Sequence, residues 1–226
     1  MLSYLIIAKV GIMAKRIFVT ATNTDIGKTY TTKLLLEEFA SRGYRVGVIK
    51  PVETGVDEIA LDGNNLLECI KNLNLEFKDI NVEDIVPITH KLPAAPYISS
   101  NFSKLDLKKI DLAVQKIEKL CDILLIEGAG GLYVPLDDEY MIIDLIEYFK
   151  ASALLVTHCS LGCINDTLLS TKALEDRDIK YLVAFNLRDS CEEFSIVSEP
   201  YFKKINFEVL KVNENIDTIC DVLYNK

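Results

Sequence analysis

A glycine, a lysine and a threonine stand together near the start of the chain, in the segment ATNTDIGKT (21–29). The apolar, β-branched segment KRIFVTA (15–21) precedes it, and a helical pattern follows from Lys28. The first N–H groups of a helix have no intrahelical partner and attract anions. Gly27 lets the backbone approach a phosphate, the Lys28 ammonium binds phosphate oxygens, and the Thr29 hydroxyl is a usual ligand of Mg²⁺. This segment therefore predicts a loop that binds nucleotide phosphates.

The spacing in this loop departs from the common pattern G-x-x-x-x-G-K-[ST], because Thr22 stands where the first glycine is expected. Gly-Lys-Thr alone is also compatible with a solvated helix start that binds no ligand. The strand pattern before it and the helix pattern after it favour the phosphate-binding interpretation.

Charged residues that could bind a ligand also stand at the ends of two later strand patterns. Lys50 ends RVGVIK and is followed by Pro51, while Glu127 follows DILLI and begins EGAGG. The carboxyl ends of parallel strands meet at one edge of a sheet, so we expect both side chains beside the phosphate-binding loop. A carboxylate there can bind Mg²⁺, and the glycines of EGAGG allow close approach of the backbone. The alternatives are an exposed lysine at the end of a strand and an ordinary carboxylate in a turn.

The segment LGCIND (161–166) begins another predicted helix, after the strand SALLVTH (152–158). Its backbone N–H groups at 162–165 could bind a carboxylate. The alternative is an ordinary helix start with Asn165 or Asp166 as the N-cap. His158, Cys159 and Cys163 resemble metal ligands, but their place at a strand end favours a turn.

Strand and helix patterns alternate along the chain, which predicts a parallel sheet. We expect strands at 15–21, 45–52, 122–131, 152–158, 180–186 and 207–212. We expect helices at 28–42, 61–75, 103–120, 166–177 and 216–223. The apolar spacing of Leu107, Ile110, Val114 and Ile117 marks one helix face. The predicted fold class is therefore α/β, a P-loop NTPase-like open, mainly parallel sheet with helices on both faces, in a single domain over 1–226.

Composition narrows the class of protein further. The chain has 226 residues, half of them apolar, and a net charge of −9, which argues against an extended nucleic-acid interface. Its six cysteines form no C-x-x-C pair, so we predict neither a disulfide framework nor a zinc site. This use of cysteine predicts a cytoplasmic location. Residues 2–12 are apolar but interrupted by Lys9, and they are too short to span a bilayer, so we expect no membrane association. Residues 1–13 are interpreted as an N-terminal extension, or Met13 as the start.

The ordered segments ATNTDIGKT, KPVETG, IEGAGGLYVPL and LGCIND together resemble the dethiobiotin synthetase family, over about residues 15–186. Phosphate-binding loops of that family have five residues between the first glycine and GKT, which accounts for the spacing, although Ala21 replaces that glycine. The resemblance implies a ligase of biotin biosynthesis that uses ATP and Mg²⁺. It would convert 7,8-diaminononanoate and CO₂ to dethiobiotin through a carbamate and a carbamic-phosphoric anhydride, releasing ADP and phosphate.

The resemblance also implies roles for individual residues. The implied catalytic residues are Lys28, Lys50 and Thr54. The implied nucleotide contacts are Thr24, Asp25, Ile26, Gly27, Lys28, Thr29, Tyr30 and Asn186. The implied Mg²⁺ ligands are Thr29, Glu127 and Asp62, with Asp57 as an alternative to Asp62. The implied substrate contacts are Lys50, Thr54, Gly128, Ala129, Gly130, Gly162, Cys163, Ile164, Asn165 and Tyr201.

The family also implies a homodimer whose substrate site lies at the subunit interface, where residues 162–165 of the neighbouring chain would hold the substrate carboxylate. The segments PAAPYISS (93–100) and GLYVPL (131–136) would contact the apolar chain of the substrate. We expect Pro93 and Pro96 to keep the first of these segments extended.

The resemblance is weakest at the base of the nucleotide, because the family segment G-x-I-P-x-L is absent and FEVLKVNENID stands in its place. This absence predicts looser discrimination between ATP and other nucleoside triphosphates. Two other interpretations remain. A cobyrinate-type amidating synthetase would need a glutamine-hydrolysing domain, and a partition-type ATPase switch would carry an extra lysine early in the loop, where this chain reads Ala-Thr-Asn-Thr.

Overall fold

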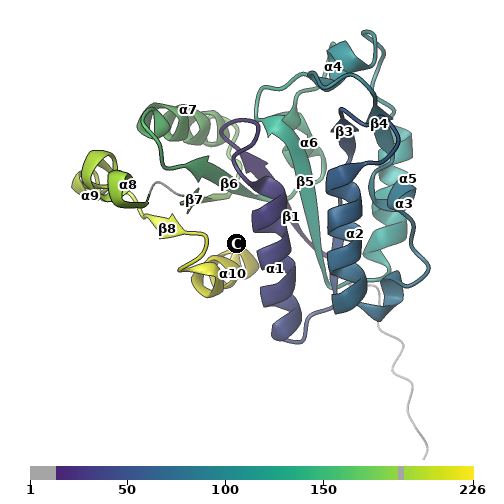
Figure 1. Cartoon of the computed structure of the whole chain (residues 1–226), viewed down its shortest axis with the longest axis horizontal. Helices are drawn as coiled ribbons and strands as arrows, with labels where there is room; N and C mark the ends of the chain where they lie inside the picture. The colour runs from purple at the N-terminus through teal and green to yellow at the C-terminus, as the bar shows by residue number, and fades with distance from the viewer. Residues whose placement is uncertain (1–13, 188–190) are drawn as a thin grey trace, which may run out of the picture.

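The computed structural model describes residues 14–187 and 191–226. Their main sheet has the strand order β2-β5-β1-β6-β7-β8, and all of the pairings are parallel (Figure 1). The strand bounds are Lys15–Ala21 for β1, Val46–Ile49 for β2, Ile123–Gly131 for β5, Ser152–His158 for β6, Tyr181–Asn186 for β7 and Leu210–Lys211 for β8. The predicted parallel sheet is confirmed. The predicted last strand, 207–212, is shorter than expected.

Helices cover both faces of this sheet (Figure 1). On one side, α1 (Lys28–Ser41) packs between α2 (Leu61–Leu73) and α10 (Ile216–Asn225). Three further helices pack against β2, β5 and β6: α5 (Leu107–Glu118), α6 (Ile142–Tyr148) and α7 (Cys163–Glu175). The five helices that the sequence patterns predicted are therefore present, and α6 was not predicted. A buried parallel sheet needs such cover on each face, because its strands are apolar on both sides.

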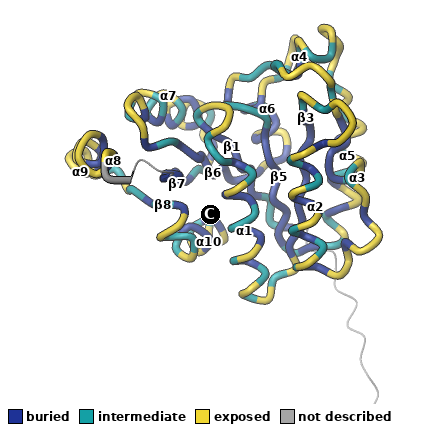
Figure 2. Tube along the Cα trace, viewed as in Figure 1, coloured by how far each residue is buried: buried dark blue, intermediate teal, exposed yellow. Residues whose placement is uncertain are grey.

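The core lies between the sheet and these helices, as the dark blue strands of Figure 2 show. Phe18 of β1, Phe39 of α1 and Phe185 of β7 are fully buried there. On α5, Ile110, Val114 and Ile117 are buried, as their spacing predicts.

Smaller elements border the main sheet, and the sequence patterns did not predict them. A second parallel sheet pairs β3 (Val52–Thr54) with β4 (Ile88–His90). The short helices are η1 (Leu75–Phe77), α3 (Val82–Ile85), α4 (Pro96–Ser99), α8 (Cys191–Val197) and α9 (Glu199–Lys204).

The extended conformation predicted for Pro96 is wrong, because Pro96 is the first residue of α4. Proline is favoured at that position, where its missing N–H would have no partner and its φ already suits a helix. The predicted start of α7 also needs correction. This helix begins at Cys163 with Gly162 as the N-cap, in a left-handed conformation (φ 101°), so neither Asn165 nor Asp166 is the cap.

Residues 1–13, interpreted above as an N-terminal extension, lie outside the described residues. Within 14–187 and 191–226, no helix is both long and apolar enough to cross a bilayer.

Candidate active site

The phosphate-binding loop leaves β1 at the carboxyl edge of the sheet and enters α1. Gly27, the N-cap of α1, has φ 97° and ψ 34°, a left-handed conformation that favours glycine. Asp25 also has a positive φ, 56°. Among the described residues, no side chain caps this helix, so its first N–H groups remain available to an anion. The local geometry is that of an anion-binding helix start.

A cavity of about 720 Å³ lies beside this loop. Segments from four parts of the chain border it: the loop and the start of α1, the end of β2 with β3 and the start of α2, the proline-containing segment before α4, and the end of β5. The residues lining it are Thr24, Asp25, Gly27, Lys28, Thr29, Tyr30, Lys50, Glu53, Thr54, Asp62, Pro93, Ala94, Ala95, Pro96, Ala129, Gly130 and Val134. We refer to it as the carboxyl-edge cavity.

An ion-pair network of two buried side chains, Lys50 and Glu127, and the partly exposed Asp62 borders the carboxyl-edge cavity. The Lys50 ammonium contacts Glu127 Oε1 at 2.7 Å and Asp62 Oδ2 at 2.9 Å. The side chains of Lys50 and Glu127 are 5% and 0% exposed. Burial alone would lower the pKa of Lys50, but the two carboxylates outweigh it and raise this pKa. Burial would raise the pKa of Asp62, and the Lys50 ammonium more than reverses that effect.

Two threonines of α1 complete the contacts of Glu127. Thr29 Oγ1 donates to Glu127 Oε1 at 2.9 Å. Thr32 Oγ1 lies 2.8 Å from Glu127 Oε2 and 2.9 Å from the carbonyl of Lys28. Because β5 pairs with β1 so that Glu127 lies opposite Val19, the carboxylate reaches the first turn of the helix that β1 leads into. Thr32 was not predicted as a site residue, and its place one turn after Thr29 is the signal that could have identified it.

Lys28 is the second ammonium in the cavity. Its Nζ donates to the carbonyl of Asn23 at 3.3 Å, within the loop. Burial, with a smaller effect from Lys50, lowers the pKa of Lys28 to about 8. A phosphate beside this ammonium would stabilise its charged form.

The oxygen atoms of Thr29, Asp62 and Glu127 form a donor set that fits Mg²⁺, which prefers oxygen ligands and usually retains water and phosphate oxygens. Both carboxylates already face one cation, the Lys50 ammonium. In the described part of the chain, no group of three or more His, Cys, Asp or Glu side chains is arranged to hold a metal.

Asp57, Gly128 and Asn186 do not line the carboxyl-edge cavity. Asp57 pairs with Lys91 at 3.7 Å, and both side chains are exposed, so only Asp62 of the two alternatives contacts Lys50. At Gly128, a Cβ would lie 2.8 Å from Phe18 Cε1, so a larger residue would not fit beside that ring. Asn186 lies at the end of β7 and donates to the carbonyl of Ile26, in the phosphate-binding loop, at 2.8 Å.

The start of α7, which carries Gly162, Cys163, Ile164 and Asn165, does not border the carboxyl-edge cavity within one chain, and neither does Tyr201 of α9. His158 connects to this helix start instead: its ring nitrogens contact Ser160 Oγ at 2.7 Å and Asp166 Oδ2 at 3.0 Å. The strand end predicted for His158 is confirmed.

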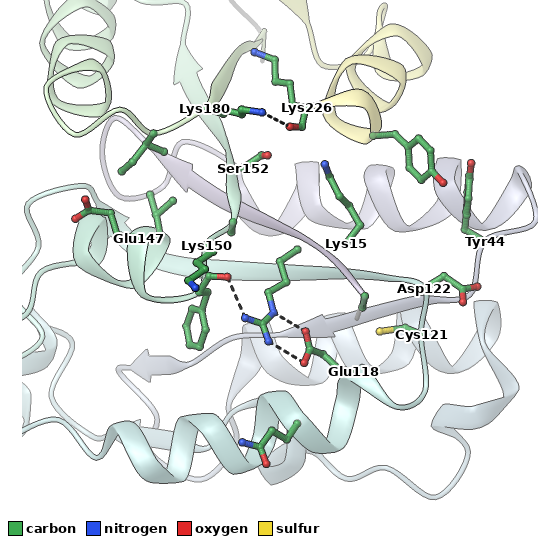
Figure 3. A pocket seen from close by; sticks show the side chains of 18 of the residues that line it. Lys15, Tyr44, Glu118, Cys121, Asp122, Glu147, Lys150, Ser152, Lys180 and Lys226 are labelled. Atoms are coloured by element: carbon green, nitrogen blue, oxygen red, sulfur yellow. Dashed lines mark hydrogen bonds and ion pairs between the residues drawn. The ribbon is translucent and has the colours of Figure 1, made fainter. Parts of the chain in front are cut away.

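A second, larger cavity of about 1560 Å³ lies at the opposite, amino edge of the sheet (Figure 3). Its charged side chains include Lys15, Arg16, Glu118 and Lys150. Arg16 forms two hydrogen bonds with the Glu118 carboxylate, at 2.5 and 2.9 Å. We refer to it as the amino-edge cavity. It contains none of the residues predicted to bind a ligand.

The fold and the loop at 21–29 define a P-loop nucleotide-binding α/β protein. A family model described as an AAA domain matches residues 15–221. Two solved plasmid partition proteins from Borrelia burgdorferi share the fold. One matches with a TM-score of 0.58 and 10% identity over 95% of this chain and 99% of its own. The other, bound to AMPPNP, matches with a TM-score of 0.53 and 10% identity, over 88% of this chain and 86% of its own.

Curated relatives identify the family within this class. An ATP-dependent dethiobiotin synthetase of Sulfurovum sp. is 44% identical over 84% of this chain and 90% of its own length. The enzyme of the same name from Wolinella succinogenes is 34% identical over 92% of this chain and 98% of its own length. That of Helicobacter pylori strain Shi470 is 32% identical over 84% and 89%. The chain therefore belongs to the ATP-dependent dethiobiotin synthetase family.

Proposed function

We propose that this chain closes the cyclic urea of dethiobiotin on 7,8-diaminononanoate in the carboxyl-edge cavity, with CO₂ as the carbon source and ATP as the phosphoryl donor. The observation that carries the proposal is the Lys50 ammonium, held between Asp62 and Glu127 beside the loop of Lys28. Such a site offers fixed positive charge to phosphoryl and carbamate oxygens, which is what this reaction requires.

The reaction needs three bond-forming steps. One substrate amine attacks CO₂ and loses a proton, which gives a carbamate. A carbamate oxygen then attacks the γ-phosphorus of ATP, and ADP leaves. The second amine attacks the carbamoyl carbon of this mixed anhydride, releases phosphate and a proton, and closes the ring. No protein nucleophile is needed, so catalysis consists of orientation and charge stabilisation.

The residues of the cavity divide between the two reactants. Lys28 and the N–H groups of residues 24–30 would bind the nucleotide phosphates, and Lys50 would face the carbamate oxygens with Thr54 near the amines. Thr29, Asp62 and Glu127 would hold Mg²⁺, which neutralises phosphate charge when it is bound. Pro93, Ala94 and Val134 give the cavity an apolar wall suited to the methylene chain of the substrate.

We further propose that the chain acts as a homodimer. The start of α7 lies outside the cavity of its own chain, so it would serve the cavity of a partner by binding the substrate carboxylate with N–H groups at Gly162–Asn165. Tyr201 is 41% exposed and would add a hydroxyl donor.

The test is formation of dethiobiotin from 7,8-diaminononanoate, ¹⁴C-bicarbonate and MgATP. We expect one ¹⁴C incorporated for each ADP formed. ATP hydrolysis that never yields labelled product would refute the proposal, and it would favour an ATPase switch of the partition type, which has the same fold.

The nucleotide base gives a separate test. Asn186 is the only residue implied at the base, and the segment after β8 uses Asn213 to accept a hydrogen bond from Tyr30 at 2.7 Å. As a hypothesis, we expect GTP and CTP to support ring closure within about tenfold of ATP, because a lost base contact changes binding by about that factor. Steady-state rates with the three nucleotides measure it, and a much stronger preference for ATP would contradict it.

A further inference from the structure

Glu53 is a buried carboxylate in the carboxyl-edge cavity to which the proposed reaction gives no role. It lies in β3 and is 6% exposed. Its Oε1 accepts the N–H of Asp62 at 3.0 Å, and its Oε2 accepts the N–H of Gly63 at 2.9 Å. These N–H groups belong to the first turn of α2, for which the N-cap residue, Ala60, provides no side-chain cap. Glu53 therefore caps this helix from another element.

The surroundings of Gly63 restrict this contact further. A Cβ at position 63 would lie 2.3 Å from Val86 Cγ2 and 3.3 Å from Glu53 Oε2, so the close approach of the carboxylate depends on glycine. Both oxygens of Glu53 are then directed at the helix. On the same turn, the Asp62 side chain reaches the Lys50 ammonium at 2.9 Å.

We infer that Glu53 is a positioning residue for Asp62. By holding the N–H groups of Asp62 and Gly63, it fixes the first turn of α2 and thereby directs the Asp62 carboxylate toward Lys50 and the oxygen donors of Thr29 and Glu127. The functional part of this inference rests on the proposed role of these oxygens in holding Mg²⁺.

Glu53→Gln tests the inference with little change in shape. The amide has one acceptor oxygen, so its NH₂ group faces one of the two N–H groups without bonding it. Loss of one charge-assisted hydrogen bond corresponds to about tenfold in an equilibrium constant. We expect the Mg²⁺ concentration for half-maximal rate to rise by about that factor, with the KM for diaminononanoate within about twofold of the original value.

The matched control is Glu58→Gln, which makes the same change at an exposed position of the same segment. A readout without turnover is Mn²⁺ binding to the ADP complex, measured by electron paramagnetic resonance. We expect about tenfold weaker Mn²⁺ binding in Glu53→Gln and no change in Glu58→Gln. Unchanged Mn²⁺ binding in Glu53→Gln would overturn the inference. If that variant is unfolded, the measurement is made on Glu53→Asp, whose shorter side chain cannot reach both N–H groups.

A double-mutant cycle with Asp62→Asn separates positioning from general stabilisation. Because Glu53 is inferred to act through Asp62, adding Glu53→Gln to Asp62→Asn should weaken Mn²⁺ binding by less than about twofold. If Mn²⁺ binding in the double variant were weakened by the product of the two single-variant factors, Glu53 would not act through Asp62. Ring closure by the unaltered chain is measured in parallel: its absence, with the Mn²⁺ differences intact, would refute the proposed function and leave the positioning role standing.

Discussion

The two cavities at opposite edges of the sheet differ in how deeply their charged side chains are buried. The amino-edge cavity is the larger, about 1560 Å³ against about 720 Å³ at the carboxyl edge. Its pair Arg45–Asp122 faces solvent, with side chains 43% and 34% exposed, and its pair Arg16–Glu118 is partly buried, at 18% and 13%. At the carboxyl edge, Lys50 and Glu127 are paired with almost no exposure. Exposed pairs contribute little, whereas buried charges are costly and are retained where they do chemistry. Buried charge therefore marks the site better than cavity volume does.

The largest expected effect comes from removing the buried cation. Lys50→Met should lower kcat about 10³-fold, because a fixed charge beside the reacting oxygens is lost. It should also destabilise the fold by about 3 kcal/mol, since Glu127 would remain buried without its counter-ion. Ring-closure kinetics and urea unfolding measure these changes. The matched control, Lys119→Met, alters an exposed lysine at the amino edge and should leave kcat within about twofold. Equal effects of the two substitutions would remove the contrast between the cavities.

A smaller effect is expected one contact further from the reactants. Thr32→Val removes the hydroxyl beside Glu127 Oε2, so the carboxylate is held less firmly, and kcat should fall about tenfold. Thr31→Val is the matched control, because Thr31 is equally buried on the same helix but its hydroxyl donates to the carbonyl of Gly27, at 2.9 Å. Single-turnover rates compare the two variants. If both lose activity equally, the effect comes from α1 as a whole and not from Glu127.

At the amino edge, we expect an effect on stability and none on catalysis. Arg16→Met removes the two hydrogen bonds to Glu118 and the contact with the Phe149 carbonyl at 3.1 Å. The free energy of unfolding should fall by about 1 kcal/mol, with kcat/KM unchanged. Urea unfolding and the ring-closure assay measure both quantities. A large loss of kcat/KM in a folded Arg16→Met protein would give the amino-edge cavity a functional role.

The smallest expected effect on stability concerns Asp137, in the segment that follows β5. Burial would raise its pKa, but hydrogen bonds from the N–H groups of Leu105, Glu139 and Tyr140 outweigh burial and lower it. A pKa below that of the unfolded chain adds stability above the unfolded value, and this contribution is lost as pH falls through the folded value. Unfolding measured between pH 6 and about pH 3 should show this loss.

Asp137→Asn is the control for that pH dependence. Its amide oxygen still accepts N–H groups, so we expect a cost of only about 0.5–1 kcal/mol at neutral pH and a flatter stability curve below about pH 4. The same acid-side slope in both proteins would assign it to other carboxylates.

The local pattern of the sequence determined the strand–loop–helix units and the chemistry at their ends. The glycine and lysine of the loop, Lys50 after β2 and Glu127 in β5 could be predicted because strand ends and helix starts are marked by neighbouring residues. The sharing of one edge by these residues also followed, since parallel strands place their carboxyl ends together. The family resemblance added the substrate, which residue spacing alone does not specify.

Only the tertiary structure decided which of these residues touch. Lys50 contacts Glu127 and Asp62 because strand order and register bring β2, β5 and α2 together. No short-range sequence pattern predicts that contact. Glu53 gave no signal in the sequence because its partners are backbone N–H groups of another element. Only the packing of β1 against β5 shows that Gly128 lies beside Phe18, where a Cβ would come within 2.8 Å of the ring.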